Sequence, residues 1–122
     1  MNFRFVGDKI HGILDYVVAI ALVIVPFVLN FQAVSPFAQW FSVVAGIGLF
    51  IYSLITGYSL SARALISFRL HLALDFIAGI AFLITPFIFG FGGTPRTIYL
   101  VVGAAVILLV FVTDPNVEAK TP

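Results

Sequence analysis

Two histidine–aspartate pairs carry nearly all of the ionisable chemistry inside the apolar stretches of this chain. His11 precedes Asp15 by four positions, and His71 precedes Asp75 by the same spacing. Side chains four positions apart share one face of a helix. Imidazoles exchange protons near neutral pH, and imidazoles and carboxylates both ligate metals. The candidate chemistry is therefore proton or ion transfer, metal binding, or a hydrogen-bonded polar clamp.

The two pairs belong to an internal repeat. Residues 9–16 recur sixty residues later as 69–76, and residues 25–28 recur as 85–88. Each copy places a basic residue, a histidine and an aspartate at the start of a long apolar run, with Pro-Phe near its end. The chain therefore reads as one unit used twice.

Composition places these apolar runs in a lipid bilayer. Hydrophobic residues make up 62% of the chain and charged residues 9%, which is more apolar surface than a water-soluble domain of this size can bury. About 20 apolar residues cross a bilayer as a helix. We therefore expect an all-α integral membrane protein with four spans, at about residues 10–30, 37–59, 69–90 and 96–113.

The four spans pair into two tandem helical hairpins. We assign residues 1–61 to the first repeat, 62–113 to the second, and 114–122 to a polar tail that we expect to be disordered. Each repeat contains an even number of spans, so both copies enter the membrane in the same direction. The axis that relates them is then a pseudo-twofold along the membrane normal.

Both hairpin turns end in a hydroxyl residue followed by proline, as Ser35-Pro36 and Thr94-Pro95. A hydroxyl side chain caps the free N–H groups at a helix start, and proline is favoured at the first helical position. We therefore expect Ser35 and Thr94 to cap the second and fourth helices.

Other small or rigid residues shape the spans. Pro26 and Pro86 lie inside the first and third spans and are expected to kink them. Gly46 and Gly103 fall at similar places in the second and fourth spans, where a small residue permits close helix contact. These glycines serve either the internal core or a homodimer face.

The basic residues predict the orientation. Most of them lie at the N-terminus, in the central loop and in the tail, whereas Arg96 lies at the opposite end. The positive-inside rule then places both termini in the cytoplasm, in a bacterial inner membrane. Net charge is +1, and the basic residues are scattered, so nothing points to nucleic acid as a partner. The chain has no cysteine, which excludes disulfides and thiolate chemistry.

Three interpretations of the paired histidines and aspartates stay open. We expect all four residues to gather around the pseudo-axis near the cytoplasmic end, paired within one helix or across the repeats. In the leading interpretation they form a polar cluster with a structural or partner-binding role. In the alternative they serve a proton- or ion-coupled channel or transporter, either as one chain or as an oligomer, since four short helices leave little room for an internal pore. A third interpretation is a divalent metal, or a haem held by both histidines.

The residues do not predict an enzyme. Serines are few, and no set of nucleophile, base and orienting residue can be assembled from the sequence. We therefore expect a non-enzymatic membrane protein, without a required cofactor, whose partners are the lipid bilayer and either a second copy of the chain or a larger membrane complex.

The tandem unit resembles the bacterial SPW-repeat membrane proteins. The resemblance rests on the stretches 11–15 and 71–75, and on Val25-Pro26-Phe27 and Thr85-Pro86-Phe87, which stand in place of Ser-Pro-Trp. It covers both hairpins and implies a small membrane protein built from repeated helical hairpins. It implies no particular activity.

Overall fold

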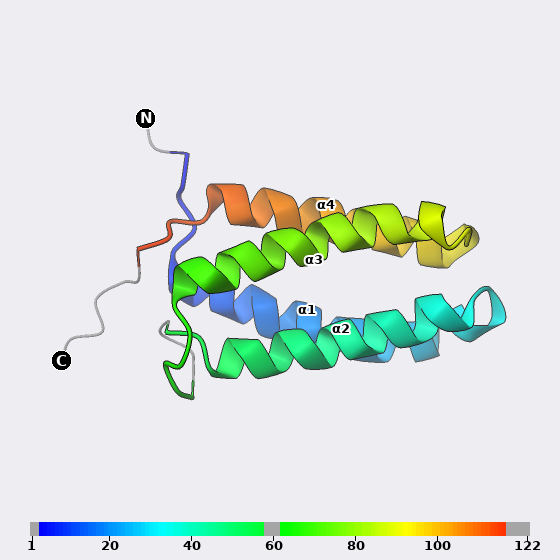
Figure 1. Cartoon of the computed structure of the whole chain (residues 1–122), viewed down its shortest axis with the longest axis horizontal. Helices are drawn as coiled ribbons and strands as arrows, with labels where there is room; N and C mark the ends of the chain where they lie inside the picture. Colours follow the sequence, from blue (N-terminus) through cyan, green and yellow to red (C-terminus); the bar gives the residue numbers. More distant parts are fainter. Residues whose placement is uncertain (1–2, 58–61, 117–122) are drawn as a thin grey trace.

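All four apolar runs form long helices, as the composition predicts. The computed structural model describes residues 3–57 and 62–116, so most of the polar tail lies outside the described residues. The helices form two hairpins that lie side by side, with both ends of the chain at the same end of the bundle (Figure 1). In chain order the elements are α1 (Asp8–Val28), the 3-10 helix η1 (Phe31–Ala33), α2 (Pro36–Leu54), α3 (Phe68–Ile88) and α4 (Gly93–Val112).

The outer surfaces of these helices are apolar. Each of the four long helices is long and apolar enough to cross a membrane. On α1, for example, Ile13, Val17, Ile20 and Ile24 recur every three or four positions and are exposed. A surface stripe of this kind is unfavourable in water and ordinary in lipid. The chain is therefore an integral membrane protein with four spans.

Close backbone contact joins the two helices of each hairpin. A Cβ atom at Gly46 of α2 would lie 2.7 Å from the carbonyl oxygen of Ala19 in α1. At Gly103 of α4 a Cβ atom would lie 2.7 Å from the carbonyl oxygen of Gly79 in α3. Both glycines therefore serve the interior of their own hairpin, which settles the choice that the sequence left open.

The two hairpin turns differ. Ser35 caps α2 as predicted, since its hydroxyl accepts from the N–H of Ala38 at 3.2 Å. The prediction for Thr94 is wrong, because α4 begins at Gly93 with Gly92 as its N-cap, so Thr94 and Pro95 already lie within the first helical turn. Glycines with positive φ at residues 90 and 93 explain the earlier start, because they let this turn reverse in fewer residues.

Both prolines lie inside their helices, and at Pro26 another residue replaces the hydrogen bond that the proline cannot make. Pro26 in α1 has no N–H to donate to the carbonyl of Leu22, one helical turn earlier. The hydroxyl of Ser42 in α2 donates to that carbonyl instead, at 2.7 Å. Pro86 occupies the corresponding place in α3. The expected kinks at Pro26 and Pro86 stay a prediction.

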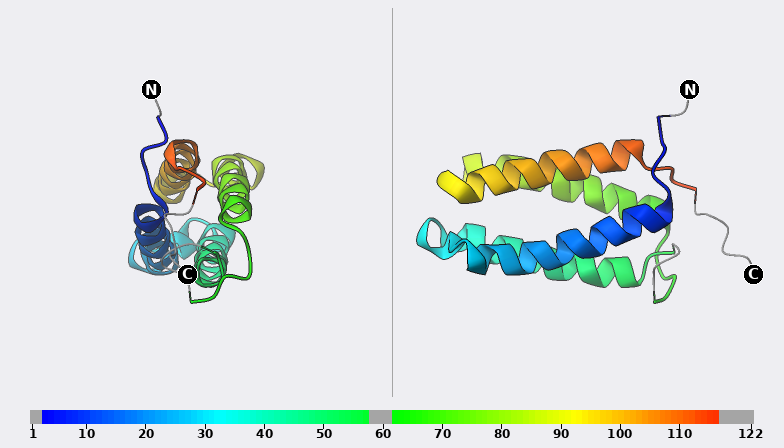
Figure 2. Two further views of the ribbon diagram at one scale, coloured as in Figure 1. Left: turned by 90° about the vertical axis from the view of Figure 1, so that its left-hand side faces the viewer. Right: turned by 180° about the vertical axis from the view of Figure 1, so that it is seen from behind.

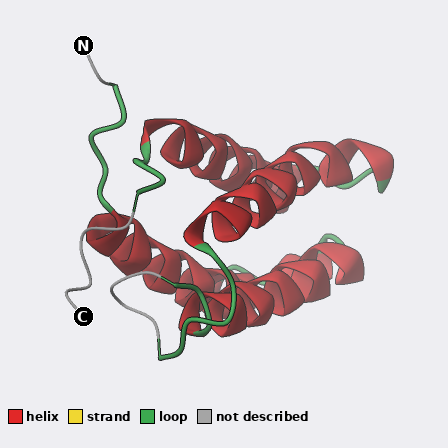
Figure 3. Cartoon of the chain, turned by 60° about the vertical axis from the view of Figure 1, so that its left-hand side comes forward, coloured by secondary structure: helices red, strands yellow, loops and turns green. Residues whose placement is uncertain are grey.

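Short backbone pairings close the end of the bundle that carries the termini. Val6 pairs with Thr113 just after α4, and Ile66 pairs with Thr56 just after α2. The N–H of Val6 donates to the carbonyl of Val112 at 3.0 Å. Figure 3 shows the loops that make these pairings gathered at one end of the helices. Each repeat therefore binds its entry segment to the exit of the other repeat.

The two hairpins contact each other at both ends of the bundle. Seen end-on, the four helices surround a common centre (Figure 2). Near the termini the hairpins meet through polar side chains from α1 and α3, described below as the polar junction. Near the turns they meet through a largely aromatic cluster, the aromatic junction, where the Tyr99 hydroxyl donates to the carbonyl of Ala38 at 2.7 Å. Its buried members are Leu22, Phe31, Ala38, Phe82, Phe91 and Tyr99.

A cavity of about 220 Å³ separates the two junctions. Its lining comes from all four long helices, and the side chains are apolar except at one end. That end is formed by Asp15, Tyr52 and Asp75. The interior of the bundle is thus hollow next to the polar junction and filled by rings next to the turns.

Candidate functional site

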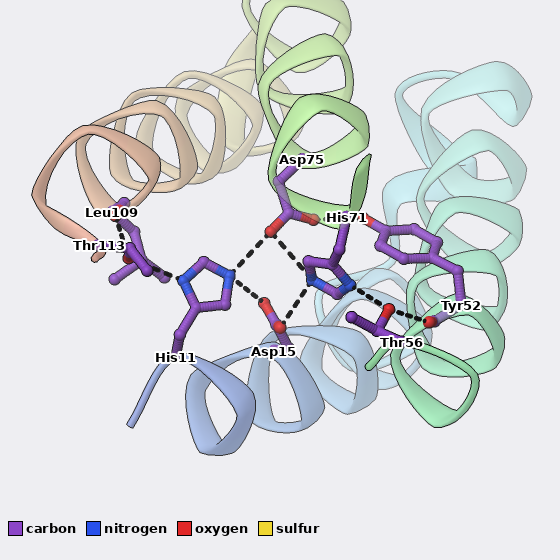
Figure 4. A network of polar contacts seen from close by, with 8 residues as sticks. All are labelled: His11, Asp15, Tyr52, Thr56, His71, Asp75, Leu109 and Thr113. Atoms are coloured by element: carbon purple, nitrogen blue, oxygen red, sulfur yellow. Dashed lines mark hydrogen bonds and ion pairs between the residues drawn. The ribbon is translucent and has the colours of Figure 1, made fainter. Parts of the chain in front are cut away.

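The polar junction is built from the first turns of α1 and α3. The spacing of four positions places His11 over Asp15 and His71 over Asp75, on the helix faces that point at each other (Figure 4). His11 and His71 have 0% exposed surface, and Asp15 and Asp75 have 4% and 3%. The structure therefore brings together all four residues that the sequence singled out.

The four side chains form a closed ring of contacts. The Nε2 atom of His11 lies 2.9 Å from Asp75 and 3.2 Å from Asp15. The Nε2 atom of His71 lies 2.9 Å from Asp15 and 3.2 Å from Asp75. Each imidazole thus contacts both aspartates, and the shorter contact runs to the other hairpin. The sequence left open whether pairing runs within a helix or across the repeats, and the structure has both.

Two threonines that the sequence analysis missed hold the other side of each imidazole. His11 Nδ1 lies 2.9 Å from the hydroxyl oxygen of Thr113, and His71 Nδ1 lies 2.8 Å from that of Thr56. Each threonine hydroxyl donates its proton to the backbone carbonyl one turn earlier in its own helix. A hydroxyl has one proton, so each threonine oxygen accepts from Nδ1–H. Both rings are thereby oriented with Nε2 toward the aspartates.

The threonines come from the partner repeat in both cases. Thr56 follows α2 and serves His71 of α3, whereas Thr113 follows α4 and serves His11 of α1. The pairings of Thr56 with Ile66 and of Thr113 with Val6 hold both threonines under the rings. A sequence signal for them exists, because a threonine lies at or near the end of the second apolar run of each repeat. That signal is weak without a structure.

A tyrosine breaks the twofold symmetry of the ring. The hydroxyl of Tyr52 in α2 donates to Oδ1 of Asp75. Asp75 therefore presents Oδ2 alone to both imidazoles, whereas Asp15 contacts His11 through Oδ1 and His71 through Oδ2. The corresponding position in the second repeat is Leu109, which has no donor. The carboxylate of Asp75 is thus held by a phenol from the other hairpin.

Aromatic and apolar groups surround the ring. Phe68 packs its edge against His11 with ring centroids 5.4 Å apart, and the two imidazoles lie 5.6 Å apart. Beyond Asp15, Asp75 and Tyr52 the cavity wall is apolar. In such surroundings unpaired charge is costly, so the ring must be close to neutral as a whole.

The ring's contacts limit its chemistry. A nitrogen lone pair and a carboxylate oxygen at 2.9 Å repel unless a proton or a cation lies between them. Two protons or one divalent ion would satisfy the ring equally. The haem hypothesis does not fit, because carboxylate oxygens lie within 3.2 Å of both Nε2 atoms, where the macrocycle would have to be.

The comparisons with known proteins agree with the repeat. The family described as SPW repeat domain matches residues 9–113, which contain both hairpins and the whole polar ring. No curated protein and no solved structure matches the chain.

Proposed function

The chain belongs to the SPW repeat domain family, and we propose that this domain is a non-enzymatic membrane module whose polar ring clamps its two repeats together. The observation that carries the proposal is the pattern of contacts at the ring. The shortest contact of each imidazole, and the threonine behind each imidazole, all come from the other hairpin. Nearly every strong contact of the ring therefore joins repeat to repeat.

Lipid makes such a clamp useful. Two apolar hairpins gain little from burying apolar surface against each other, because lipid chains are equally apolar. Directional hydrogen bonds decide which faces meet and in which register. The central cavity strengthens the point, since residues of both hairpins line it over that stretch. We infer that the ring fixes the relative position of the repeats near the termini.

A transport role has less support. A path for protons or ions needs polar groups or water from one face to the other. Beyond Asp15, Tyr52 and Asp75 the cavity wall is apolar, and the buried rings of the aromatic junction follow it. We therefore place the ring as a closed structural site, and measured ion flux that depends on it would overturn this assignment.

We also propose the orientation that the basic residues predict, with both termini and the polar junction on the cytoplasmic side of a bacterial inner membrane. The exposed residues Ala33 and Asn116 lie at opposite ends of the bundle. The chain has no cysteine, so Ala33→Cys and Asn116→Cys each create a single label site. An impermeant thiol reagent added outside intact cells should label the first variant and spare the second. Labelling of the second variant and not of the first would show that the orientation is the opposite of the one proposed.

The clamp itself is tested by the distance between the hairpins. Spin labels on Ile51→Cys of α2 and Leu108→Cys of α4 report this distance, since both positions are exposed near the polar junction. With a chelator present throughout, we expect a narrow distance distribution in the parent and a broader, longer one after Asp15→Ala/Asp75→Ala.

Two further variants serve as controls in that experiment. Asp15→Asn/Asp75→Asn keeps hydrogen-bonding groups at both positions and should stay close to the parent. Asp114→Asn removes a carboxylate outside the ring and should have no effect. A parent-like distribution in the alanine double variant would refute the clamp.

A further inference from the structure

The ring has the donor set of a metal centre. It offers two imidazole nitrogens and two carboxylate oxygens, all buried, and these ligand atoms lie within 4.8 Å of one another. They come from two helices, with one histidine and one aspartate a turn apart on each. Buried groups of this composition are rare in membrane spans, where each ionisable side chain is costly.

The threonines supply an independent observation that points to a cation. Neutral histidine ligates a metal through one nitrogen while the other donates a proton to a neighbouring acceptor. Thr56 and Thr113 can only accept at Nδ1, because their own protons are given to backbone carbonyls. In the neutral rings both Nε2 lone pairs therefore point into the space between the carboxylates. The Tyr52 hydroxyl donates to Oδ1 of Asp75 and so turns Oδ2 of that carboxylate toward the imidazoles.

The separations suit a small ion. Zinc binds imidazole nitrogen at about 2.0–2.1 Å and carboxylate oxygen at about 2.0–2.2 Å. Adjacent ligands of a tetrahedral ion with such bonds are then about 3.3 Å apart. The ring's nitrogen–oxygen separations are 2.9 and 3.2 Å. These contacts use both oxygens of Asp15, and the ligand atoms taken one per residue all lie within 4.8 Å of one another. Seating a tetrahedral ion therefore requires the most distant ligand atoms to move closer together.

The charge of the ring and the types of its ligand atoms limit which ions it can bind. Two carboxylates with two neutral imidazoles carry a charge of −2, so one divalent cation makes the buried site neutral. Imidazole ligands favour zinc and its transition-metal neighbours, whereas magnesium and calcium prefer a shell made only of oxygen. No thiolate or thioether ligand is among the four.

We propose that His11, Asp15, His71 and Asp75 bind one divalent transition-metal ion of the zinc type between the two repeats, oriented by Thr56, Thr113 and Tyr52. The inference rests on the proposed clamp, since the ion would join the same two hairpins that the hydrogen bonds join. Coordinate bonds would then replace hydrogen bonds at the ring. The site would be buried beside the central cavity, with no open coordination position assigned to a substrate.

The test uses the full chain in detergent, stripped with a chelator and then titrated with Co²⁺, which reports its geometry in visible absorption. We expect one ion per chain, a tetrahedral-type spectrum, and displacement of Co²⁺ by Zn²⁺ as measured by elemental analysis. Absence of retained metal after gel filtration, or an octahedral spectrum typical of loosely held surface ions, would overturn the proposal.

Two sets of variants locate the ion. Asp15→Asn/Asp75→Asn should abolish Co²⁺ binding and keep the hairpin distance of the parent, because amides can hydrogen-bond but add no negative charge. Thr56→Val/Thr113→Val should weaken Co²⁺ affinity by about 10–100-fold, and the serine versions should restore it. Thr97→Val removes an exposed threonine with the same intrahelical bond and should change nothing. Unchanged binding in the asparagine variant would refute this site.

The two proposals fail in different ways. If the clamp is wrong, the alanine double variant leaves the spin-label distances unchanged with chelator present. If only the metal site is wrong, those distances respond as expected and no Co²⁺ is retained. A result of the second kind leaves a ring held by hydrogen bonds alone.

Discussion

The two ends of this bundle join the same hairpins by different physical means. At the polar junction, four ionisable side chains contact one another at 2.9–3.2 Å within an apolar surround. At the aromatic junction, rings such as Phe41 and Phe82 pack across the two hairpins with centroids 5.4 Å apart, and the Tyr99 hydroxyl donates to the carbonyl of Ala38. The aromatic junction joins the hairpins by packing of ring surfaces, whereas the polar junction joins them by contacts between particular nitrogen and oxygen atoms.

The difference teaches which contacts give specificity in lipid. Ring packing tolerates changes of shape as long as the volume is kept. A buried polar ring does not, because losing one member leaves its partners unsatisfied in a medium that cannot solvate them. The polar junction should therefore be sensitive to substitutions that the aromatic junction accepts.

Removing one imidazole should have the largest effect. His71→Ala leaves Asp15 and Asp75 facing each other with a single imidazole between them, and breaking a buried pair in this way costs about 3–5 kcal/mol. Unfolding of the purified protein in a denaturing detergent titration, with chelator present, measures the loss. A loss below about 1 kcal/mol would mean that the ring contributes little to stability.

The threonines behind the rings should come next. Thr56→Val keeps the size of the side chain and removes the acceptor for His71 Nδ1–H, which costs about 1–3 kcal/mol when a buried donor is left without a partner. Thr113→Val should have the same effect at His11. Thr56→Ser and Thr113→Ser keep the hydroxyl and should recover most of the stability in the same titration. Equal losses in the valine and serine variants would assign the effect to packing instead.

A small loss of apolar volume at the aromatic junction should cost less. Phe82 is buried against Phe41 and Tyr99. Phe82→Leu keeps an apolar side chain there and removes roughly one methylene of volume, a loss that typically costs about 0.5–1.5 kcal/mol. A larger loss than that of Thr56→Val, measured side by side, would contradict the difference drawn between the two ends.

The smallest effect is expected at the Tyr99 hydroxyl of the aromatic junction. Tyr99→Phe deletes the hydroxyl that donates to the Ala38 carbonyl and leaves the ring in place. The expected loss is about 1 kcal/mol, the net value of an ordinary hydrogen bond. Spin labels at Ile51→Cys and Leu108→Cys should show no change in hairpin distance, because the clamp lies at the other end. A broadened distribution there would show that Tyr99 also sets the hairpin position.

The sequence by itself determined the spans, the hairpins and the four ring residues. Hydrophobicity over about 20 residues is a local property, and so is the spacing of four that puts a histidine and an aspartate on one helix face. The repeat then implied that both pairs lie at one end of the membrane. Ser35 was also predictable, because a cap with proline behind it acts within a single helical turn.

Only the tertiary structure decided what surrounds those residues. Thr56, Thr113 and Tyr52 reach the ring from segments far along the chain, and their roles depend on how the loops bring the two repeats together. A threonine at the end of an apolar run looks like any other helix-ending residue until an imidazole is placed beside it. Thr94 failed as a cap for a related reason, since the glycine-rich turn before it let α4 begin earlier. Local periodicity thus identified the chemically active side chains, and their partners followed from packing between distant segments.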